Sequence, residues 1–330
     1  LTEILDANKI TIEHRYFAES TPQPLNWEHL TIWQAATDHH KIINALKGLY
    51  KGKWVSTGIS KGGQATMFHR RFYPDDVEAS VPYVAPLNLA REDKRIHQFL
   101  DQVGTPQARH KIRRFQKNML ADKEAFLPLF EAYAIEKDYQ FPMDIERAFE
   151  LTVLEYPFAF WQWGSVPVSN IPRSEDPVQE RFDHLVKVSS PDFFAKEGIK
   201  EMRPFFYQAM SEIGMYDYRF APFREYLEDT NNITFEHTMA DSMEVAFDST
   251  AMRDVHNWLK KHGNRMMYIY GEQDPWSATA FTPSEKTDAV KFVNPGGSHK
   301  TRIRSFPLTM QDSIYTVLEK WLDVDIEETE

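Results

Sequence analysis

The segment "KWVSTGISKGG", residues 53–63, constrains the fold more than any other part of the chain. Its first half is short, apolar and β-branched, which predicts a buried strand. Glycines stand two residues before and two residues after Ser60, and a helical pattern follows over residues 64–72. Gly-x-Ser-x-Gly between a strand and a helix is typical of a sharp turn that exposes the serine hydroxyl, because glycine leaves room for neighbouring backbone. The alternative is a tight turn in which Ser60 only caps the helix.

The segments around this turn alternate between strand and helix patterns. We expect strands at 8–17, 53–59, 77–86, 265–271 and 288–297, and helices at 27–50, 64–72, 249–261 and 308–322. Alternation of this kind predicts a parallel sheet covered by helices on both faces. The sequence therefore predicts an α/β core made of residues 1–90 and 246–330.

The middle of the chain, residues 91–245, has a different pattern. It is rich in Lys, Arg, Glu, Phe and Leu at helical spacing and contains few strand-like runs. We expect helix breaks at its prolines, which are Pro142, Pro157, Pro167, Pro172, Pro191 and Pro204. This segment is predicted to be a helical cap inserted into the core.

Composition and charge narrow the classes of function. The 330 residues carry a net charge of −11, which argues against a nucleic-acid partner and leaves a small molecule or a peptide. There is no cysteine, so no disulfide or thiolate site is expected. The sequence shows no membrane span, signal peptide or phosphate-binding loop. The chain begins at Leu1, within a predicted fold, so we expect that a segment precedes it.

Histidine pairs raise the question of a metal. His39-His40 and Glu13-His14 do not supply three converging ligands, and the motif HExxH is absent. A place at the surface or at the edge of the core explains them better. We expect neither a metal nor an organic cofactor.

Two residues far along the chain complete the chemistry that Ser60 would need. A serine hydroxyl is a weak nucleophile unless a base removes its proton and a third group orients that base. Asp274 directly follows the predicted strand at 265–271, and His299 follows the next strand in a glycine-rich loop. Serine, acid and histidine in this order, each after a strand, are the arrangement of an α/β-hydrolase. We therefore predict a catalytic triad of Ser60, Asp274 and His299.

Longer segments resemble one family of peptidases. The segments are "WVSTGISKGGQATMFHRRFYPDDVEASVPYVAPLN", "EHRYFAESTP", "QAMSEIGMYDY", "YGEQDPWSA" and "GGSHKTRI". They resemble the prolyl tri/tetrapeptidyl aminopeptidase family of serine peptidases, which is related to lysosomal Pro-X carboxypeptidase and dipeptidyl peptidase II. The similarity runs over most of the chain.

The resemblance implies an exported exopeptidase that removes a short peptide, a tripeptide in the first instance, from a free N-terminus after proline. The acyl-enzyme would form on Ser60, and the backbone N–H of Lys61 would be one oxyanion-hole donor. The second donor usually follows an earlier strand, and the strand ending in "EHRYF" corresponds to the one after it. No candidate for that donor is visible in this sequence.

Substrate selection requires an anchor for the ammonium group. A carboxylate in a partly desolvated cap meets this need, and Glu212 and Glu155 are the candidates. Trp161 and Trp163 are candidates for the walls of a proline pocket, and the alternative is that all four are ordinary cap residues. Two other functions stay open: a carboxylesterase or lipase with the same triad, and a non-catalytic binding protein with an incomplete oxyanion hole.

Overall fold

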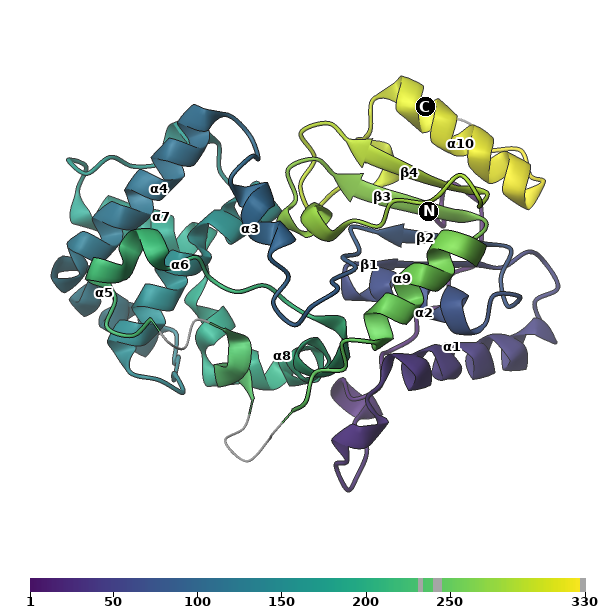
Figure 1. The fold of residues 1–330 in the computed structure, drawn as a ribbon, viewed down its shortest axis with the longest axis horizontal. Coiled ribbons are helices and arrows are strands. Elements are labelled where there is room, and N and C mark those ends of the chain that lie inside the picture. The colour runs from purple at the N-terminus through teal and green to yellow at the C-terminus, as the bar shows by residue number, and fades with distance from the viewer. Residues whose placement is uncertain (231–233, 240–244, 327–330) are drawn as a thin grey trace. The chain divides into compact units, whose positions relative to one another are not determined.

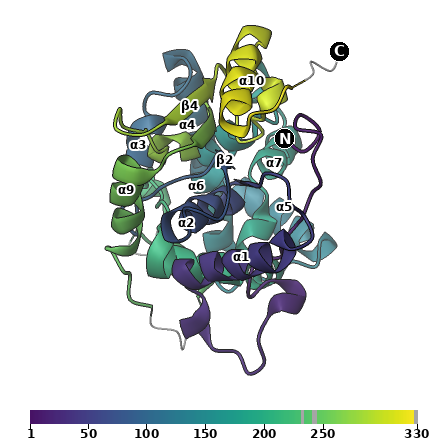
Figure 2. The same ribbon diagram turned by 90° about the vertical axis from the view of Figure 1, so that its right-hand side faces the viewer.

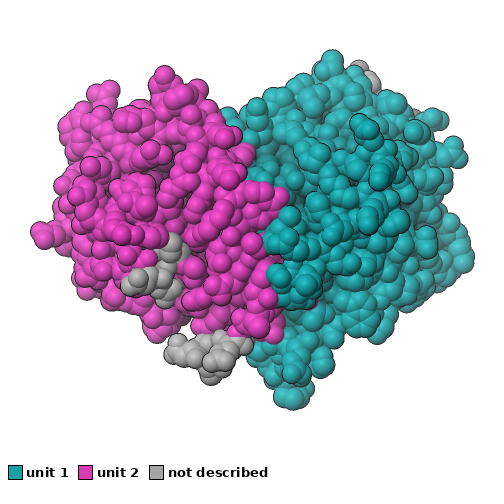
Figure 3. Space-filling model, viewed as in Figure 1, with its two compact units in different colours: residues 1–89, 248–330 teal, residues 90–247 magenta. Residues whose placement is uncertain are grey.

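The computed structural model describes residues 1–230, 234–239 and 245–326. The chain forms two compact units, which Figure 3 colours separately. The first unit consists of Leu1–Leu89 and Asp248–Glu330, and the second is Ala90–Phe247. None of the helices in the described residues has the length and apolar character that a membrane crossing requires.

A parallel sheet of four strands is the centre of the first unit. The strands are β1 (Val55–Ile59), β2 (Ala79–Tyr83), β3 (Met266–Gly271) and β4 (Ala289–Asn294), and they lie side by side in chain order. Every residue of β2 and β3 is buried, which agrees with the apolar runs that predicted them. Because all pairings are parallel, the loops that follow the strands leave the sheet at one edge.

Helices cover both faces of this sheet. Ala79, Val81 and Tyr83 pack in one apolar cluster with α10 (Leu308–Leu322). Ser80 points to the opposite face, as alternation along a strand requires, and accepts a hydrogen bond from Arg70 of α2 (Lys61–Phe72). Helices α1 (Ile32–Lys47) and α9 (Ala251–His262) contact α2, as Figures 1 and 2 show. The α/β prediction is confirmed for the described residues.

The predicted strand at residues 8–17 is wrong. Residues 8–14 have no regular secondary structure, and residues 15–20 form turns and a short 3₁₀ helix, Ala18–Ser20. Tyr16 and Ala18 have φ angles of 70° and 40°, values outside the range of a strand. The β-branched residues of this segment favour an extended backbone, but a strand also needs a neighbouring strand with which to pair. None of the described strands pairs with this segment.

The second unit consists mainly of helices. They are α3 (Arg95–Leu100), α4 (Pro106–Ala121), α5 (Lys123–Glu136), α6 (Ile145–Trp163), α7 (Val178–Val188) and α8 (Lys196–Gln208). Pro157 and Pro204 lie inside α6 and α8, so the breaks predicted at these two residues are wrong. The apolar side of α6 is buried over most of its length, and this packing maintains the helix through Pro157. That the unit acts as a cap stays a prediction.

Candidate active site

Ser60 occupies a strained turn between β1 and α2. Its φ and ψ angles are 55° and −119°, a combination that non-glycine residues rarely adopt. The Ser60 N–H donates to the Tyr83 carbonyl (2.9 Å), and the Gln64 N–H donates to the Ser60 carbonyl (3.0 Å). The Ser60 side chain makes no capping hydrogen bond, although the residue stands at the N-cap position. The turn therefore has the geometry of a nucleophile elbow rather than that of an ordinary serine cap.

The glycines around Ser60 differ in how much space a side chain would have at their positions. A Cβ atom on Gly58 would lie 2.1 Å from the Gly62 carbonyl oxygen. A Cβ atom on Gly63 would lie 2.7 Å from the Ala85 Cβ, whereas one on Gly62 would meet nothing within 4 Å. The close approach of β1, α2 and the end of β2 thus requires glycine at positions 58 and 63.

Asp274 and His299 are in direct contact after β3 and β4. The His299 Nδ1 lies 2.7 Å from the Asp274 Oδ2, and both residues are buried, with exposed fractions of 5% and 0%. The Trp276 N–H donates to the other carboxylate oxygen (3.1 Å). Burial raises the pKa of Asp274, while the hydrogen bonds from His299 and Trp276 act in the opposite direction. An ionised carboxylate only accepts hydrogen bonds, so His299 donates from Nδ1 and its Nε2 can accept a proton.

Backbone contacts hold the two loops together. The Gln273 N–H donates to the Gly297 carbonyl (2.8 Å), and the Glu272 N–H donates to the Asn294 carbonyl (3.0 Å). A Cβ atom on Gly271 would lie 2.5 Å from the Gly297 carbonyl oxygen, so glycine permits this approach. The loops therefore carry Asp274 and His299 to the sheet edge at which Ser60 also lies.

Lys61 begins α2, and its side chain reaches a segment distant in sequence. The backbone N–H groups of a first helical turn have no partner within the helix, which suits the predicted donor role of Lys61. The Lys61 Nζ lies 3.1 Å from the His14 Nε2, and 6.0 Å from the centre of the Phe17 ring. Sequence reasoning missed this contact, because nothing in the local pattern relates residues so far apart.

Glu155 of the second unit lies in a buried aromatic cluster. It is 6% exposed, and the Tyr216 hydroxyl donates to its carboxylate (2.8 Å). Burial raises the pKa of Glu155 to about 8, an effect that the hydrogen bond from Tyr216 and the neighbouring Tyr218 hydroxyl oppose. Both tyrosines are buried as well. The prediction from sequence named the carboxylate without its tyrosine partners.

The other three predicted substrate residues differ in exposure. Trp161 is 6% exposed, and a Cβ atom on Gly104 would lie 2.3 Å from its ring, so this indole is tightly packed. It also lines a small cavity of about 70 Å³ together with Phe158 and both tyrosines. Trp163 is 43% exposed, and Glu212 is half-buried in the π-helical turn Ala209–Ile213. Of the four predicted substrate residues, Trp161 lines this cavity, beside Tyr216, the hydrogen-bond partner of Glu155.

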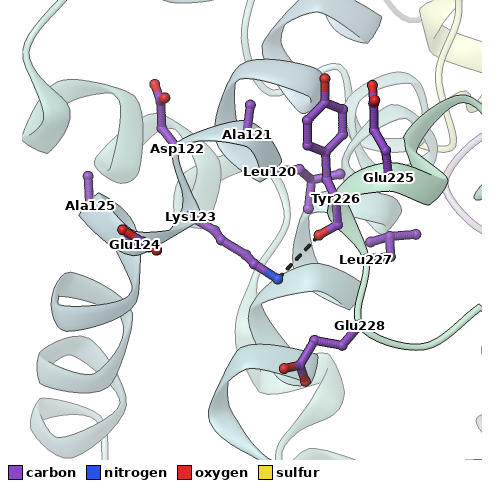
Figure 4. Close-up of a pocket in the computed structure, with 10 residues that line it drawn as sticks. All are labelled: Leu120, Ala121, Asp122, Lys123, Glu124, Ala125, Glu225, Tyr226, Leu227 and Glu228. Atoms are coloured by element: carbon purple, nitrogen blue, oxygen red, sulfur yellow. Dashed lines mark hydrogen bonds between the residues drawn. The ribbon is translucent and has the colours of Figure 1, made fainter.

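A larger hollow of about 520 Å³ lies elsewhere in the second unit. Figure 4 shows its lining, which is Leu120, Ala121, Asp122, Lys123, Glu124, Ala125, Glu225, Tyr226, Leu227 and Glu228. The Lys123 ammonium donates to the Tyr226 carbonyl (3.2 Å) and to the buried carboxylate of Glu150 (3.2 Å). These contacts tie α5, α6 and residues 225–228 together. None of the predicted catalytic or substrate residues lines this hollow.

Two histidines, one on α1 and one on α2, share a single carboxylate. His40 Nδ1 and His69 Nε2 lie 2.8 Å and 2.9 Å from the same oxygen of Asp76. Across residues 1–230, 234–239 and 245–326, no set of three His, Asp or Glu side chains could hold a metal ion. The Asp76 bonds connect α1 to α2, the helix that follows Ser60.

Comparison with known proteins agrees with this geometry. The family model described as PS-10 peptidase S37 matches residues 1–321. The chain belongs to this peptidase family. It is 29% identical over 330 residues to the prolyl tri/tetrapeptidyl aminopeptidase of Streptomyces mobaraensis, a match that covers 98% of this chain and 69% of the relative. The resemblance predicted from the sequence is therefore confirmed, and the protein is a serine peptidase.

Solved structures of lower similarity were also found. A proline iminopeptidase of Mycobacterium smegmatis aligns with a TM-score of 0.43 and 14% identity, and the alignment covers 90% of this peptidase and 74% of that chain. VinJ aligns with a TM-score of 0.39 and 12% identity over the same shares of the two chains.

Proposed function

We propose that this peptidase is an exopeptidase that releases short peptides from free N-termini and cleaves after proline. The observation that carries the proposal is the buried Asp274–His299 hydrogen bond of 2.7 Å, at the sheet edge where Ser60 occupies its strained turn. Family membership and the 29% identical aminopeptidase support the class of reaction. Release of a tripeptide and export from the cell are the finer expectations of this proposal.

In the proposed mechanism, the Ser60 Oγ attacks the carbonyl carbon of the proline residue in the substrate. The His299 Nε2 accepts the hydroxyl proton, and Asp274 stabilises the imidazolium through its bond to Nδ1. Burial of Asp274 matters here, because a low-dielectric site strengthens its interaction with a positive imidazole. The carboxylate itself stays ionised throughout.

The tetrahedral intermediate carries its negative charge on the former carbonyl oxygen. The backbone N–H of Lys61, at the start of α2, is the proposed donor to that oxygen. Collapse of the intermediate breaks the peptide bond, and His299 gives its proton to the leaving amine. Water then attacks the acyl-enzyme with His299 as base, which releases the short peptide and restores Ser60.

Recognition of the free N-terminus is assigned to the carboxylates of the second unit. Glu212 is half-buried and could pair with an ammonium group at modest desolvation cost. Glu155 has a raised pKa of about 8, so an arriving ammonium would have to displace its proton. Trp161 lines the cavity beside Tyr216 and is the proposed wall for a proline ring, with Trp163 as an exposed alternative.

A panel of chromogenic substrates tests this function. Ala-Ala-Pro and Ala-Pro derivatives are compared with free and blocked amines, beside a short acyl ester. We expect turnover of the free-amine tripeptide derivative and loss of turnover when the amine is blocked. Equal cleavage of blocked and free peptides would refute the ammonium anchor, and rapid ester hydrolysis without peptide cleavage would indicate an esterase.

The Ser60→Ala variant tests the nucleophile separately. Labelling by an organophosphonate should disappear in this variant, while its urea unfolding midpoint stays close to that of the native protein. The matched control is Ser56→Ala, on β1, which leaves the elbow intact. Labelling of Ser60→Ala at the native rate would end the assignment, and an unlabelled native protein would indicate a non-catalytic binding protein.

A further inference from the structure

The residue after the nucleophile connects the elbow to an irregular segment of the same unit. The Lys61 Nζ lies 3.1 Å from the His14 Nε2, and the His14 Nδ1 lies 2.9 Å from the Arg15 carbonyl oxygen. Phe17 packs edge-on against the His14 ring, and the Lys61 ammonium stands over the Phe17 ring. Three side chains, from positions 14, 17 and 61, thus form one cluster beside the start of α2.

The hydrogen-bond roles within this cluster follow from the donors available. A lysine ammonium can only donate, so the His14 Nε2 must be the acceptor. The ring proton then resides on Nδ1 and is donated to the Arg15 carbonyl. Burial and the neighbouring Lys61 charge lower the pKa of His14 to about 3, so the imidazole stays neutral at any ordinary working pH.

The segment that carries His14 is itself firmly held. Arg15 makes two hydrogen bonds to the Asp38 carboxylate on α1, of 2.6 Å and 2.7 Å. Tyr16 is buried and stacks on Trp27 with ring centres 5.4 Å apart. Its φ angle of 70° is strained, and such strain persists only where the surroundings impose it. The acceptor offered to Lys61 is therefore fixed in space.

We propose that the Lys61 side chain is a positioning residue for acylation, because its bond to His14 holds the first turn of α2 and so directs the Lys61 N–H at the developing oxyanion. This inference rests on the proposed function, in which that N–H is an oxyanion donor. The main chain at Ser60 has an unfavourable conformation, so an external tether at the next residue opposes its relaxation. Displacement of catalytic groups by about 1 Å can cost about 100-fold in rate.

Four variants test the tether. Lys61→Met removes the donor but keeps the aliphatic length, and Lys61→Arg keeps a donor. His14→Phe keeps a ring but removes the acceptor, whereas His14→Gln retains an acceptor for Lys61 and a donor for the Arg15 carbonyl. The matched control is Lys53→Met, since Lys53 is an exposed lysine of the same unit with an ion pair to Asp323 at 3.7 Å. Each variant is measured for phosphonate labelling rate, kcat, KM and urea midpoint.

We expect Lys61→Met and His14→Phe to lower kcat and the labelling rate by about 10- to 100-fold with KM changed less than about twofold. Lys61→Arg and His14→Gln should recover most of the rate. The double variant Lys61→Met/His14→Phe should be no slower than the slower single variant, because both remove one interaction. The Lys53→Met control should label at the native rate.

A role in stability alone would give a different result. The urea midpoints of Lys61→Met and His14→Phe would then fall while kcat and labelling stayed native, and this outcome overturns the proposal. If Lys61→Met fails to fold, the comparison of His14→Phe with His14→Gln decides the question through the same two rates. Failure of the proposed function is distinguishable, since the native protein would then cleave blocked and free peptides equally, hydrolyse only the ester, or remain unlabelled. Failure of the tether alone would leave the native protein an amine-dependent peptidase with these variants equally active.

Discussion

Replacement of Gly58 by alanine should unfold the elbow, although the change adds only one methyl group. The new Cβ would lie 2.1 Å from the Gly62 carbonyl oxygen and 2.3 Å from its carbonyl carbon. Ordinary carbon–oxygen contacts are about 3.3 Å or longer, so the overlap exceeds about 1 Å. The obstacle is backbone in the first turn of α2, and no side-chain rotation can relieve it. Either β1 or the start of α2 has to move.

The size of the effect follows from known costs of overpacking. Extra methyl groups in a packed interior cost about 1–3 kcal/mol, and a backbone obstacle places this substitution at or above about 3 kcal/mol. With a urea m-value of about 3 kcal/mol per molar, the unfolding midpoint falls by about 1 M. Gly62→Ala is the matched control, because a Cβ there meets nothing within 4 Å. That change should alter stability by about 0.5 kcal/mol or less, or increase it through reduced chain entropy.

Urea unfolding followed by tryptophan fluorescence and far-ultraviolet circular dichroism measures both variants beside the native protein. A large loss for Gly58→Ala with a native midpoint for Gly62→Ala supports the observed geometry. Equal midpoints for all three proteins would refute the reasoning from crowding. Equal damage from both substitutions would mean that the two glycines of the motif are equivalent, contrary to the structure.

Three further predictions concern the triad, the pH dependence of stability and the tryptophans. Asp274→Asn should lower kcat by about 10⁴-fold without unfolding the protein, because the amide leaves the imidazole in the wrong tautomer, and near-native kcat would contradict this role. Burial lowers the pKa of His184 to about 4. The unfolded chain therefore binds more protons than the folded chain below pH ~6.5, and stability is lost as the pH falls through that value. His184→Gln should reduce this decline in urea midpoint, and an equal decline in both proteins would count against it. Trp161→Ala should lower the free energy of unfolding by about 3–5 kcal/mol, because the indole is buried against Gly104. Trp163 is exposed, so Trp163→Ala should be nearly neutral. The reverse order of the two urea midpoints would disprove the packing assignment.

Local pattern determined most of the core elements. The last helix was predicted at 308–322 and is observed at Leu308–Leu322, since its apolar spacing is regular and Pro307 precedes it. Helix α2 begins at Lys61 rather than at the predicted Gln64. Gly62 and Gly63 lie in its first turn, although glycine lowers helix propensity, and this is why the pattern placed the start too late. The triad of Ser60, Asp274 and His299 was also predicted without the structure, from the order of these residues along the chain. Each follows a strand, and parallel strands bring such loops to one edge.

Tertiary structure alone decided three other features. Residues 8–17 have a strand pattern, yet they form no strand, because pairing depends on a neighbour that local sequence cannot supply. The motif suggests two equivalent glycines around Ser60, but the approach of α2 to β1 crowds Gly58 and leaves Gly62 open.

The contact between Lys61 and His14 is the third such feature. It joins segments with no local relation in sequence, and only the packing of the irregular N-terminal segment against α1 and α2 brings them within 3.1 Å. Sequence determined which groups could perform the chemistry, because their types and order are local properties. The fold decided how each group is held, because contacts between distant segments depend on the packing of the whole unit.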